Sequence, residues 1–218
     1  MTNNEFVAKL KKTLTIPTYY VMGGFGARLG LDYVNYNYQY NKDHRADIEK
    51  HYNTTPLTFG FDCVCLVKSV MFWNFRGDPA AEYGGAKYDK SNDITVSAFK
   101  KSCKTISTDF DNIEIGELLF IGSSHVGVYI GNGEVIESTP AWKSGVQRTL
   151  LPWRNSTNYE KLPVRTWDTH GKTSYLEYTS PAAVNTSELD TLRQRNRELT
   201  AENTKLKEKI NAALEVLK

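Results

Sequence analysis

Two cysteines, Cys63 and Cys65, stand one residue apart in the segment FGFDCVCLVKSVMF, and an aspartate precedes the first of them. A thiol attacks a carbonyl as its thiolate, but a free cysteine, with a pKa near ~8.5, is mostly protonated at neutral pH. A helix N-terminus and a neighbouring imidazolium both favour the thiolate. Asp62 is a good N-cap for a helix over residues 63–75, so Cys63 would lie in its first turn. Cys65 lies about 200° further round that helix and is expected to be a small core residue.

A base for this thiol can be sought in the strand HVGVYI, which begins at His125. Glu137 lies in the next predicted strand, EVIEST, beyond the turn GNG. A two-residue loop would place the two side chains on opposite faces of the hairpin. A three-residue loop pairs Gly127 with Glu137, and His125 and Glu137 then share a face within side-chain reach. Gly133 can supply the left-handed residue that such a loop favours.

The apolar residues of the hairpin decide between the two registers. With the three-residue loop, all of them fall on the face opposite His125 and can form a core. They are Val126, Val128, Ile130 and Ile136. This register joins His125 to Glu137 as a base and the carboxylate that orients it. The other histidines lie in polar segments and are expected at the surface; they are His44, His51 and His170.

Metal and nucleotide sites are less well supported by the same residues. Zinc could be held by Cys63, Cys65, Cys103 and His125, but structural zinc sites usually place two or more residues between neighbouring cysteines. Three cysteines are an odd number, which indicates free thiols. GGFGARLG lacks the glycine spacing of a dinucleotide site, and HGKT lacks the first glycine of a P-loop. No metal or other cofactor is therefore predicted.

The elements that would position these residues belong to an α+β domain over residues 1–168. Apolar residues at helical spacing predict a helix from Asn4 to Leu14, which Pro17 ends. The segment TYYVMGGFGARLG reads as a short extended piece followed by glycines. The period then changes to two, and GELLFIGSSHVGVYIGNGEVIEST predicts three strands of an antiparallel sheet, with VQRTLLPW and LPVRTW as two more. Residues 169–186 are polar and are predicted to be a linker.

Residues 187–218 have the heptad pattern of a coiled coil. The d positions are Leu192, Leu199, Leu206 and Ala213, and the a positions are Leu189, Asn196, Asn203, Ile210 and Leu217. Asparagine at two a positions favours a dimer of defined register, so a parallel homodimer through residues 189–217 is predicted. One amphipathic helix packed on the domain is the alternative, and a zipper fused by an engineer would have the same pattern.

Composition limits the class of protein. Of 218 residues 40% are hydrophobic, with 13 tyrosines and 4 tryptophans, which is enough for a packed core. A net charge of +2 calls for neither a nucleic acid nor an anionic membrane as partner. No run of 18 apolar residues predicts a membrane helix. The N-terminus MTNNEFVAKLKKTL lacks the features of a secretory signal, so synthesis in a cytoplasm is expected.

Five sequence blocks resemble the NlpC-type cell-wall cysteine peptidases, papain-like enzymes that cut peptidoglycan stem peptides, and phage lysins of that family look most similar. The blocks are YVMGG from Tyr20, DCVC from Asp62, GELLF from Gly116, SHVGVYIGNG from Ser124, and Glu137 twelve residues after the histidine. They occur in the family's order and span most of residues 5–155. Three positions depart from the family pattern. Val64-Cys65 replaces Ser-Gly after the nucleophile, and the third catalytic residue, often histidine, is Glu137.

The resemblance implies a papain-like fold and a Cys63–His125–Glu137 triad that cleaves an amide bond. It implies that Tyr20 stands beside the thiolate near an oxyanion site and that Asp62 and Ser124 border it. Trp142, on the loop after Glu137, could stack on substrate, with a core tryptophan as the alternative. For a phage lysin, it also implies release from the host cytoplasm by a separate pore-forming protein before action on the cell wall.

Three functions remain open at this point. A D,L-endopeptidase would cut inside the stem peptide of peptidoglycan. An N-acetylmuramoyl-L-alanine amidase of the same fold would cut the bond between the glycan and the peptide. A non-catalytic module of another class would bind cell-wall peptides and gain avidity from the coiled coil.

Overall fold

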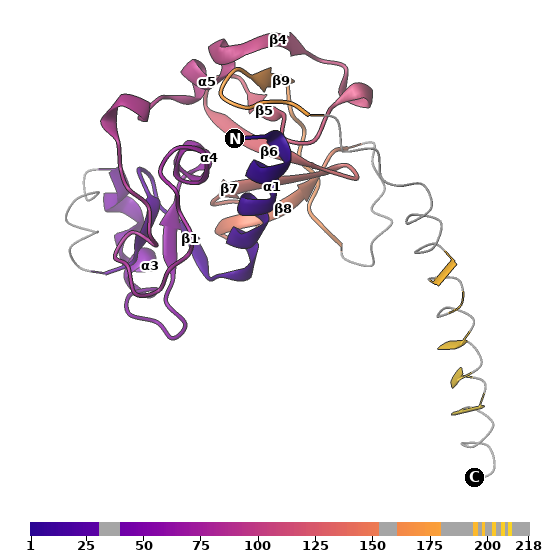
Figure 1. Ribbon diagram of the computed structural model, residues 1–218. Coiled ribbons are helices and arrows are strands. Elements are labelled where there is room, and N and C mark those ends of the chain that lie inside the picture. The colour runs from indigo at the N-terminus through magenta and orange to yellow at the C-terminus, as the bar shows by residue number, and fades with distance from the viewer. Residues whose placement is uncertain are drawn as a thin grey trace. The chain divides into compact units, whose positions relative to one another are not determined.

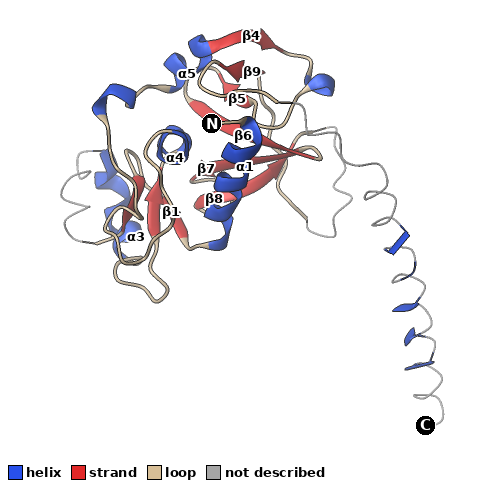
Figure 2. Cartoon of the chain, in the orientation of Figure 1, coloured by secondary structure: helices blue, strands red, loops and turns tan. Residues whose placement is uncertain are grey.

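The computed structural model describes residues 1–30, 40–152, 161–179, 194–195, 198, 202–203, 206–207 and 209–210 (Figure 1). The chain forms two compact units, Met1–Tyr178 and Thr179–Lys218. All of the predicted catalytic residues lie in the first unit, which combines helices with two sheets (Figure 2). The predicted α+β class is confirmed for this unit.

A six-stranded antiparallel sheet forms the centre of the first unit. In spatial order its strands are β4 (Cys103–Ser107), β9 (Thr169–Thr173), β5 (Leu118–Ile121), β6 (His125–Gly131), β7 (Glu134–Thr139) and β8 (Gly145–Leu150). A second sheet has the order β1 (Thr18–Tyr20), β3 (Phe59–Phe61) and β2 (Phe25–Arg28), with β1 parallel to β3. The strands β5, β6, β7 and β8 agree with the predicted ones.

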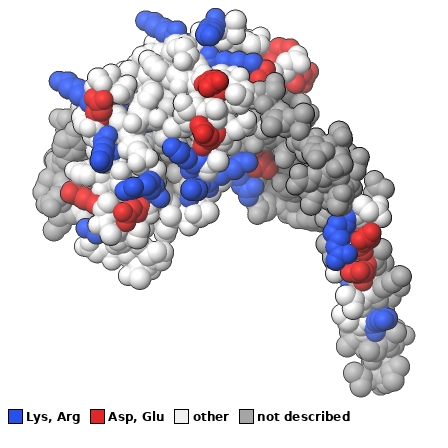
Figure 3. All heavy atoms as spheres, viewed as in Figure 1, with Lys and Arg blue, Asp and Glu red and all other residues white. Residues whose placement is uncertain are grey.

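Short helices accompany these sheets. The α-helices are α1 (Asn3–Lys12), α3 (Arg45–Glu49), α4 (Cys63–Met71) and α5 (Val96–Ser102). The 3-10 turns are Thr13–Thr15, Lys42–His44, Lys90–Asn92 and Phe110–Asn112. A capping box of Thr2 and Glu5 begins α1. Its last turn carries Lys9, Lys11 and Lys12, which complement the helix dipole, and Figure 3 shows basic side chains gathered over the region of α1.

The main core lies between one face of the large sheet and helices α1, α4 and α5. Phe6 of α1, Leu66 of α4 and Phe99 of α5 are almost fully buried in it. The four apolar residues predicted for this face of the hairpin belong to the same cluster, so the predicted core is confirmed; they are Val126, Val128, Ile130 and Ile136. The opposite face carries a smaller cluster that includes Tyr129, Val135 and Trp167.

Three predictions about the elements are wrong: the end of one helix, one strand and the start of the linker. Helix α4 ends at Met71 rather than near residue 75, and Asn74 already lies outside it with a left-handed backbone, φ of 55°. The segment LPVRTW is no strand and makes only an isolated bridge between Val164 and Leu150. The predicted linker at residues 169–186 is wrong at its start, because residues 169–173 form β9, which lies between β4 and β5.

His170 on β9 is buried, so its predicted surface position is also wrong. Its Nε2 donates to the carbonyl of Asp109 at 2.9 Å, and its Nδ1 contacts the carboxylate of Glu117. A carbonyl oxygen can only accept, so Nε2 carries a hydrogen. Both side chains are about 5% exposed, so water does not screen the contact between them.

Replacing His170 by alanine is expected to lower the free energy of unfolding by about 3 kcal/mol, because Glu117 would be left buried without its partner. Urea unfolding followed by circular dichroism measures this loss. His44→Ala is the matched control, since His44 is exposed and its side chain caps no helix. Equal stability losses in the two variants would show that the His170 contact contributes nothing.

In the second unit, the described residues from 194 to 210 are all helical. Leu206 and Ile210, which occupy predicted d and a positions, are 55% and 57% exposed in the single chain. Most of the predicted coiled coil lies outside the described residues, so the coiled coil and the homodimer stay predictions. Among the described helices, none combines the length and the apolar character that a membrane span needs.

Candidate active site

Asp62 fixes the start of α4 through both oxygens of its carboxylate. Oδ1 accepts from the backbone N–H of Cys65 at 2.6 Å, as the predicted N-cap requires. Oδ2 accepts from the N–H of Gly23 at 2.8 Å, and the N–H of Asp62 donates to the carbonyl of Gly24 at 3.0 Å. The buried carboxylate thus joins the glycine loop after β1 to the first turn of the helix, where Cys63 lies.

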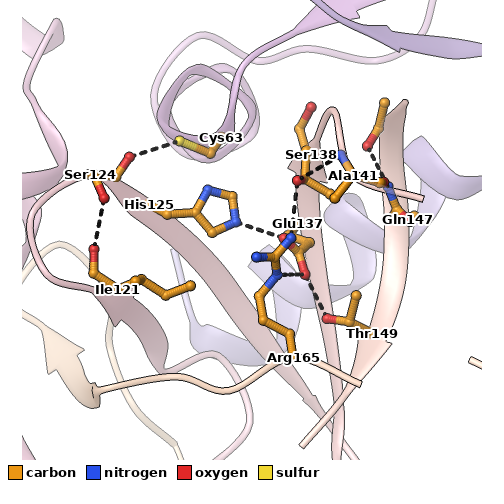
Figure 4. A network of polar contacts seen from close by, with 12 residues as sticks. Cys63, Ile121, Ser124, His125, Glu137, Ser138, Ala141, Gln147, Thr149 and Arg165 are labelled. Carbon is orange, nitrogen blue, oxygen red and sulfur yellow. Dashed lines mark hydrogen bonds and ion pairs between the residues drawn. The ribbon is translucent and has the colours of Figure 1, made fainter. Parts of the chain in front are cut away.

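The two cysteines face different parts of the protein, as predicted. Cys63 belongs to the main core beneath the large sheet, and its thiol donates to the carbonyl of Ser124 at 3.8 Å. Cys65 packs with Phe25 and Trp73 in a separate cluster. Only Cys63 therefore lies beside the start of β6, where His125 is the next residue after Ser124 (Figure 4).

The Cys63 thiol is protonated at neutral pH in this structure. Burial, together with the negative charge of Asp62, raises the pKa of Cys63 to about 12. Backbone N–H groups of Val64 and Val126 act in the opposite direction but do not compensate. A helix N-terminus therefore does not by itself offset the burial of this sulfur, and a base must accept its proton.

The hairpin of β6 and β7 has the predicted register but reaches it by a different loop. Val128 pairs with Ile136, which places Gly127 opposite Glu137 as predicted. The loop itself has two residues, Asn132 and Gly133, both left-handed, with φ of 55° and 78°. An irregularity between Tyr129 and Gly131 then shifts the register by one residue. This bulge gives the pairing of Gly127 with Glu137 that a three-residue loop was expected to give.

The register brings His125 and Glu137 into direct contact. His125 Nε2 and Glu137 Oε2 are 2.6 Å apart, with the carboxylate fully buried and the imidazole 15% exposed (Figure 4). Since an ionised carboxylate only accepts, the proton of the neutral ring lies on Nε2. Nδ1, which Figure 4 shows on the Cys63 side of the ring, has no hydrogen-bond partner among the described residues and keeps its lone pair.

Two further donors surround the carboxylate of Glu137. Thr149 Oγ1 donates to Oε1 at 2.8 Å, and Arg165 Nε donates to the same oxygen at 2.7 Å. Burial alone would raise the pKa of Glu137, but His125, Arg165 and Thr149 together hold it below its ordinary value. Glu137 is therefore an anion throughout the neutral range.

Trp167 stacks on the imidazole and limits its orientation. The ring centroids of Trp167 and His125 are 5.4 Å apart and their planes differ by 13°. Gly127 makes this possible, because a Cβ there would lie 2.6 Å from Trp167 Cη2 and 2.7 Å from Val135 Cγ1. The indole thus occupies the space that a side chain at residue 127 would take.

Gly127→Ala is expected to lower kcat about tenfold or more, because the added methyl group pushes Trp167 away from His125 and misaligns the base. Steady-state kinetics of amide-bond hydrolysis measures the change. Gly30→Ala is the matched control, since an added Cβ there meets nothing within 4 Å. An unchanged kcat in a folded Gly127→Ala protein would show that the stack does not position the ring.

The remaining predicted site residues lie around this centre in different ways. Tyr20 is close enough that burial and the charges of Cys63 and Asp62 raise the pKa of its phenol. The Ser124 hydroxyl donates to the carbonyl of Ile121 at 3.2 Å, so only its backbone carbonyl faces the thiol. Trp142 is 57% exposed, which excludes a core tryptophan.

The sequence reasoning missed Arg165, Trp167 and Thr149. Arg165 and Trp167 are two residues apart in an extended segment, so alternation alone could have placed both on one side. Their partners are 28 and 42 residues away in sequence, however, and no local pattern points to them. Among the described residues, no group of three histidine, cysteine or acidic side chains is arranged to hold a metal ion.

No model of a protein family matches the chain, and no curated protein sequence does. Among solved structures, NlpC1 from Trichomonas vaginalis is 15% identical, with a TM-score of 0.36, over 78% of this chain and 44% of that one. The chain thus spans less than half the length of the Trichomonas protein.

Two mycobacterial structures are also similar. The peptidoglycan hydrolase RipB from Mycobacterium tuberculosis is 18% identical over 81% of this chain and 67% of that one, with a TM-score of 0.40. The P60 domain of an antigen from M. avium subspecies paratuberculosis is 19% identical over 81% and 98%, with a TM-score of 0.39. One of these three solved structures is named NlpC and another P60.

Proposed function

We propose that the chain is a peptidoglycan hydrolase that cleaves an amide bond of the cell-wall stem peptide with Cys63, His125 and Glu137. The observation that carries this proposal is the 2.6 Å contact between His125 Nε2 and Glu137, which leaves Nδ1 as a free base beside the helix start that holds Cys63. A thiol, a base and an orienting carboxylate are what acyl transfer by a cysteine hydrolase needs.

In the first step Cys63 must turn from the carbonyl of Ser124 towards His125, which takes a rotation about one single bond. Nδ1 accepts the thiol proton as the sulfur bonds to the amide carbon, and the carbonyl electron pair moves to oxygen. The N–H of Cys63, at the helix start, is the proposed donor to that oxyanion, with Tyr20 beside it. Glu137 stabilises the imidazolium that forms.

In the second step the imidazolium returns its proton to the amine, which leaves as the C–N bond breaks. The acyl group remains on sulfur as a thioester. Water then attacks the thioester while Nδ1 removes its proton, and the acid and the free thiol are released. Protons and electrons balance over the cycle, so no metal or redox cofactor is required.

The choice of substrate rests on the sequence blocks shared with NlpC-type peptidases. A D,L-endopeptidase is the specific activity proposed. The exposed Trp142 would contact the substrate at the rim of the site, while Val64 and Cys65, which replace the family's Ser-Gly, would alter the subsite next to the nucleophile. Peptidoglycan of the host is the expected partner.

Mass spectrometry of purified peptidoglycan after digestion tests the proposal. A D,L-endopeptidase exposes a new amine on the residue that follows D-glutamate, whereas a muramoyl-alanine amidase exposes the amine of L-alanine. The Cys63→Ala variant should give neither product. If the protein sediments with peptidoglycan but exposes no new amine, the non-catalytic binding function is correct and the hydrolase is wrong.

A further inference from the structure

The last turns of α1 border a hollow in the surface of the first unit. Its volume is about 280 Å³, and it lies between α1, the turn that follows α1 and residues 74–76. Lys9, Lys12 and Arg76 contribute exposed basic side chains to it, whereas Thr13 and Phe75 are buried. None of its lining residues is acidic, and none belongs to the candidate active site. The hollow is therefore a separate, positively charged feature of the molecule.

The three cations around this hollow repel one another. Lys9 and Lys12 are three residues apart on α1, so their side chains lie on the same side of the helix. In the described part of the chain, no carboxylate forms an ion pair with either lysine or with Arg76. Glu5, the acidic residue of α1, accepts from the N–H of Thr2 at the other end of the helix. An anion in the hollow would relieve this repulsion.

The dipole of α1 accounts for only part of this charge. Cations stabilise the last turn of a helix, which is reason enough for Lys9 and Lys12 to be there. Arg76 belongs to a distant segment that follows α4, and it has no such role in α1. A third cation brought to the same hollow from elsewhere in the chain points to a ligand.

The segment that carries Arg76 is held by its backbone. Asn74 and Gly77 have left-handed conformations, with φ of 55° and 70°, on either side of it. The N–H of Arg76 donates to the carbonyl of Gly84 at 2.9 Å. A Cβ at Gly85 would lie 2.9 Å from Arg76 Nε, so the guanidinium lies directly against this glycine. Arg76 thus has little freedom to lose when it binds an anion.

Lys11 extends the cations to a second hollow beside α1. This hollow, of about 450 Å³, also includes Glu134 and Arg148, which pair with each other at 3.1 Å. Because a carboxylate lines it, the second hollow suits an anion less well than the first. Lys11 can instead meet the continuation of a ligand that is bound in the first hollow. Figure 3 shows basic side chains gathered over this region of α1.

We propose that the hollow at Lys9, Lys12 and Arg76 binds a phosphate group of a polyol phosphate chain, the phosphodiester polymer of many bacterial cell walls. A guanidinium donates two parallel hydrogen bonds to phosphate oxygens, and the two ammonium groups add charge. A chain with one charge on each repeat can place a further phosphate near Lys11, and the release of counterions from several such contacts adds up. This surface would hold the protein on the wall whether or not the proposed hydrolase function is correct.

A nucleic acid carries the same phosphates but fits this surface less well. Proteins that bind single strands stack the bases on exposed aromatic side chains that lie between the cations. Of the exposed large hydrophobic side chains among the described residues, none lines either hollow. Phe75, the aromatic residue of the first hollow, is buried. A flexible chain without bases needs only the cations.

Isothermal titration of the full-length protein with poly(glycerol phosphate), at several salt concentrations, tests the proposal. The triple variant Lys9→Gln, Lys12→Gln and Arg76→Gln should raise Kd about tenfold or more in dilute salt. It should also reduce the slope of log Kd against log salt by about 2, because fewer counterions are released. The three side chains are exposed, so the variant should fold, which circular dichroism checks. An absence of binding by the unaltered protein would overturn the proposal.

The matched control is the triple variant Lys42→Gln, Lys90→Gln and Lys104→Gln. It removes the same net charge from exposed positions on three other elements. Its Kd should change about twofold or less, and its salt dependence should stay as it was. Equal weakening in the two triple variants would mean that net charge, rather than this hollow, binds the polymer.

Further titrations identify the chemistry of the ligand. Inorganic phosphate should bind about a hundredfold more weakly than the polymer, and an equal Kd would mean a site for free phosphate instead. An oligothymidylate of the same charge should bind no more tightly, and tighter binding would assign the surface to nucleic acid. In ¹⁵N NMR of the unaltered protein, the polymer should shift the Nε signal of Arg76 but not that of Arg45, which pairs with Glu49. An unmoved Arg76 signal would contradict the proposal.

Discussion

Replacing Cys63 by alanine is expected to lower kcat/KM for peptidoglycan fragments by about 10⁴-fold or more. No other described thiol lies beside His125, because Cys65 faces Phe25 and Trp73, and Cys103 donates to the carbonyl of Phe99 at 3.5 Å. The variant should fold normally, since only one sulfur atom is lost from the helix start. Cys63→Ser should be almost as inactive, because a buried hydroxyl is a far weaker nucleophile than a thiol at this site.

Cys65→Ala provides the comparison within the same helix. It removes a buried sulfur two residues away and is expected to cost about 1 kcal/mol of stability while leaving kcat/KM within about threefold. The kcat/KM of both variants is obtained from the release of new amines from peptidoglycan. A colorimetric assay measures the rate of release, and mass spectrometry identifies the products. An inactive Cys65→Ala protein beside an active Cys63→Ala protein would reverse the assignment of the nucleophile.

Glu137→Gln is expected to lower kcat by about 10³-fold. Arg165 and Thr149 both donate to Oε1, so the amide oxygen of a glutamine must take that side. Its NH₂ group then faces His125 Nε2, which can only respond by accepting. The ring proton moves to Nδ1, and the nitrogen that should receive the thiol proton is already occupied.

The same variant should change how stability depends on pH. The pKa of Glu137 lies below its ordinary value in the folded protein, so folding gains stability from the ionised carboxylate above about pH 4.3, the value in an unfolded chain. That contribution is lost as the pH falls through the lower, folded pKa. Urea midpoints of the wild type and of Glu137→Gln should therefore converge below about pH 4 and separate above it.

Glu134→Gln is the control for both measurements. Glu134 is a buried carboxylate on the same strand, and it pairs with Arg148 rather than with a histidine. Its replacement should leave kcat nearly unchanged. Equal losses of kcat in the two variants would mean that β7 needs its carboxylates only to fold, and that Glu137 does not set the tautomer.

Local features of the sequence were sufficient for much of this site. Asp62 caps α4 through the backbone of Cys65, three residues away, so the position of the first turn depends on neighbours in the chain. The alternation of apolar residues from Val126 to Ile136 determined which face His125 and Glu137 share. The predicted register of β6 and β7 is found even though the loop differs from the expected one. Only this register buries the apolar face of the hairpin.

Contacts between distant segments decided the rest. Arg165 and Trp167 meet Glu137 and His125 only because the chain returns to the sheet after β8, and His170 is buried because β9 inserts between β4 and β5. The sequence by itself thus determined the cap at Asp62 and the face that His125 and Glu137 share, since caps and alternation act over a few residues. The tertiary structure decided the charge states of Cys63 and Glu137, because desolvation and ion pairing depend on everything that surrounds a group, wherever it lies in the chain.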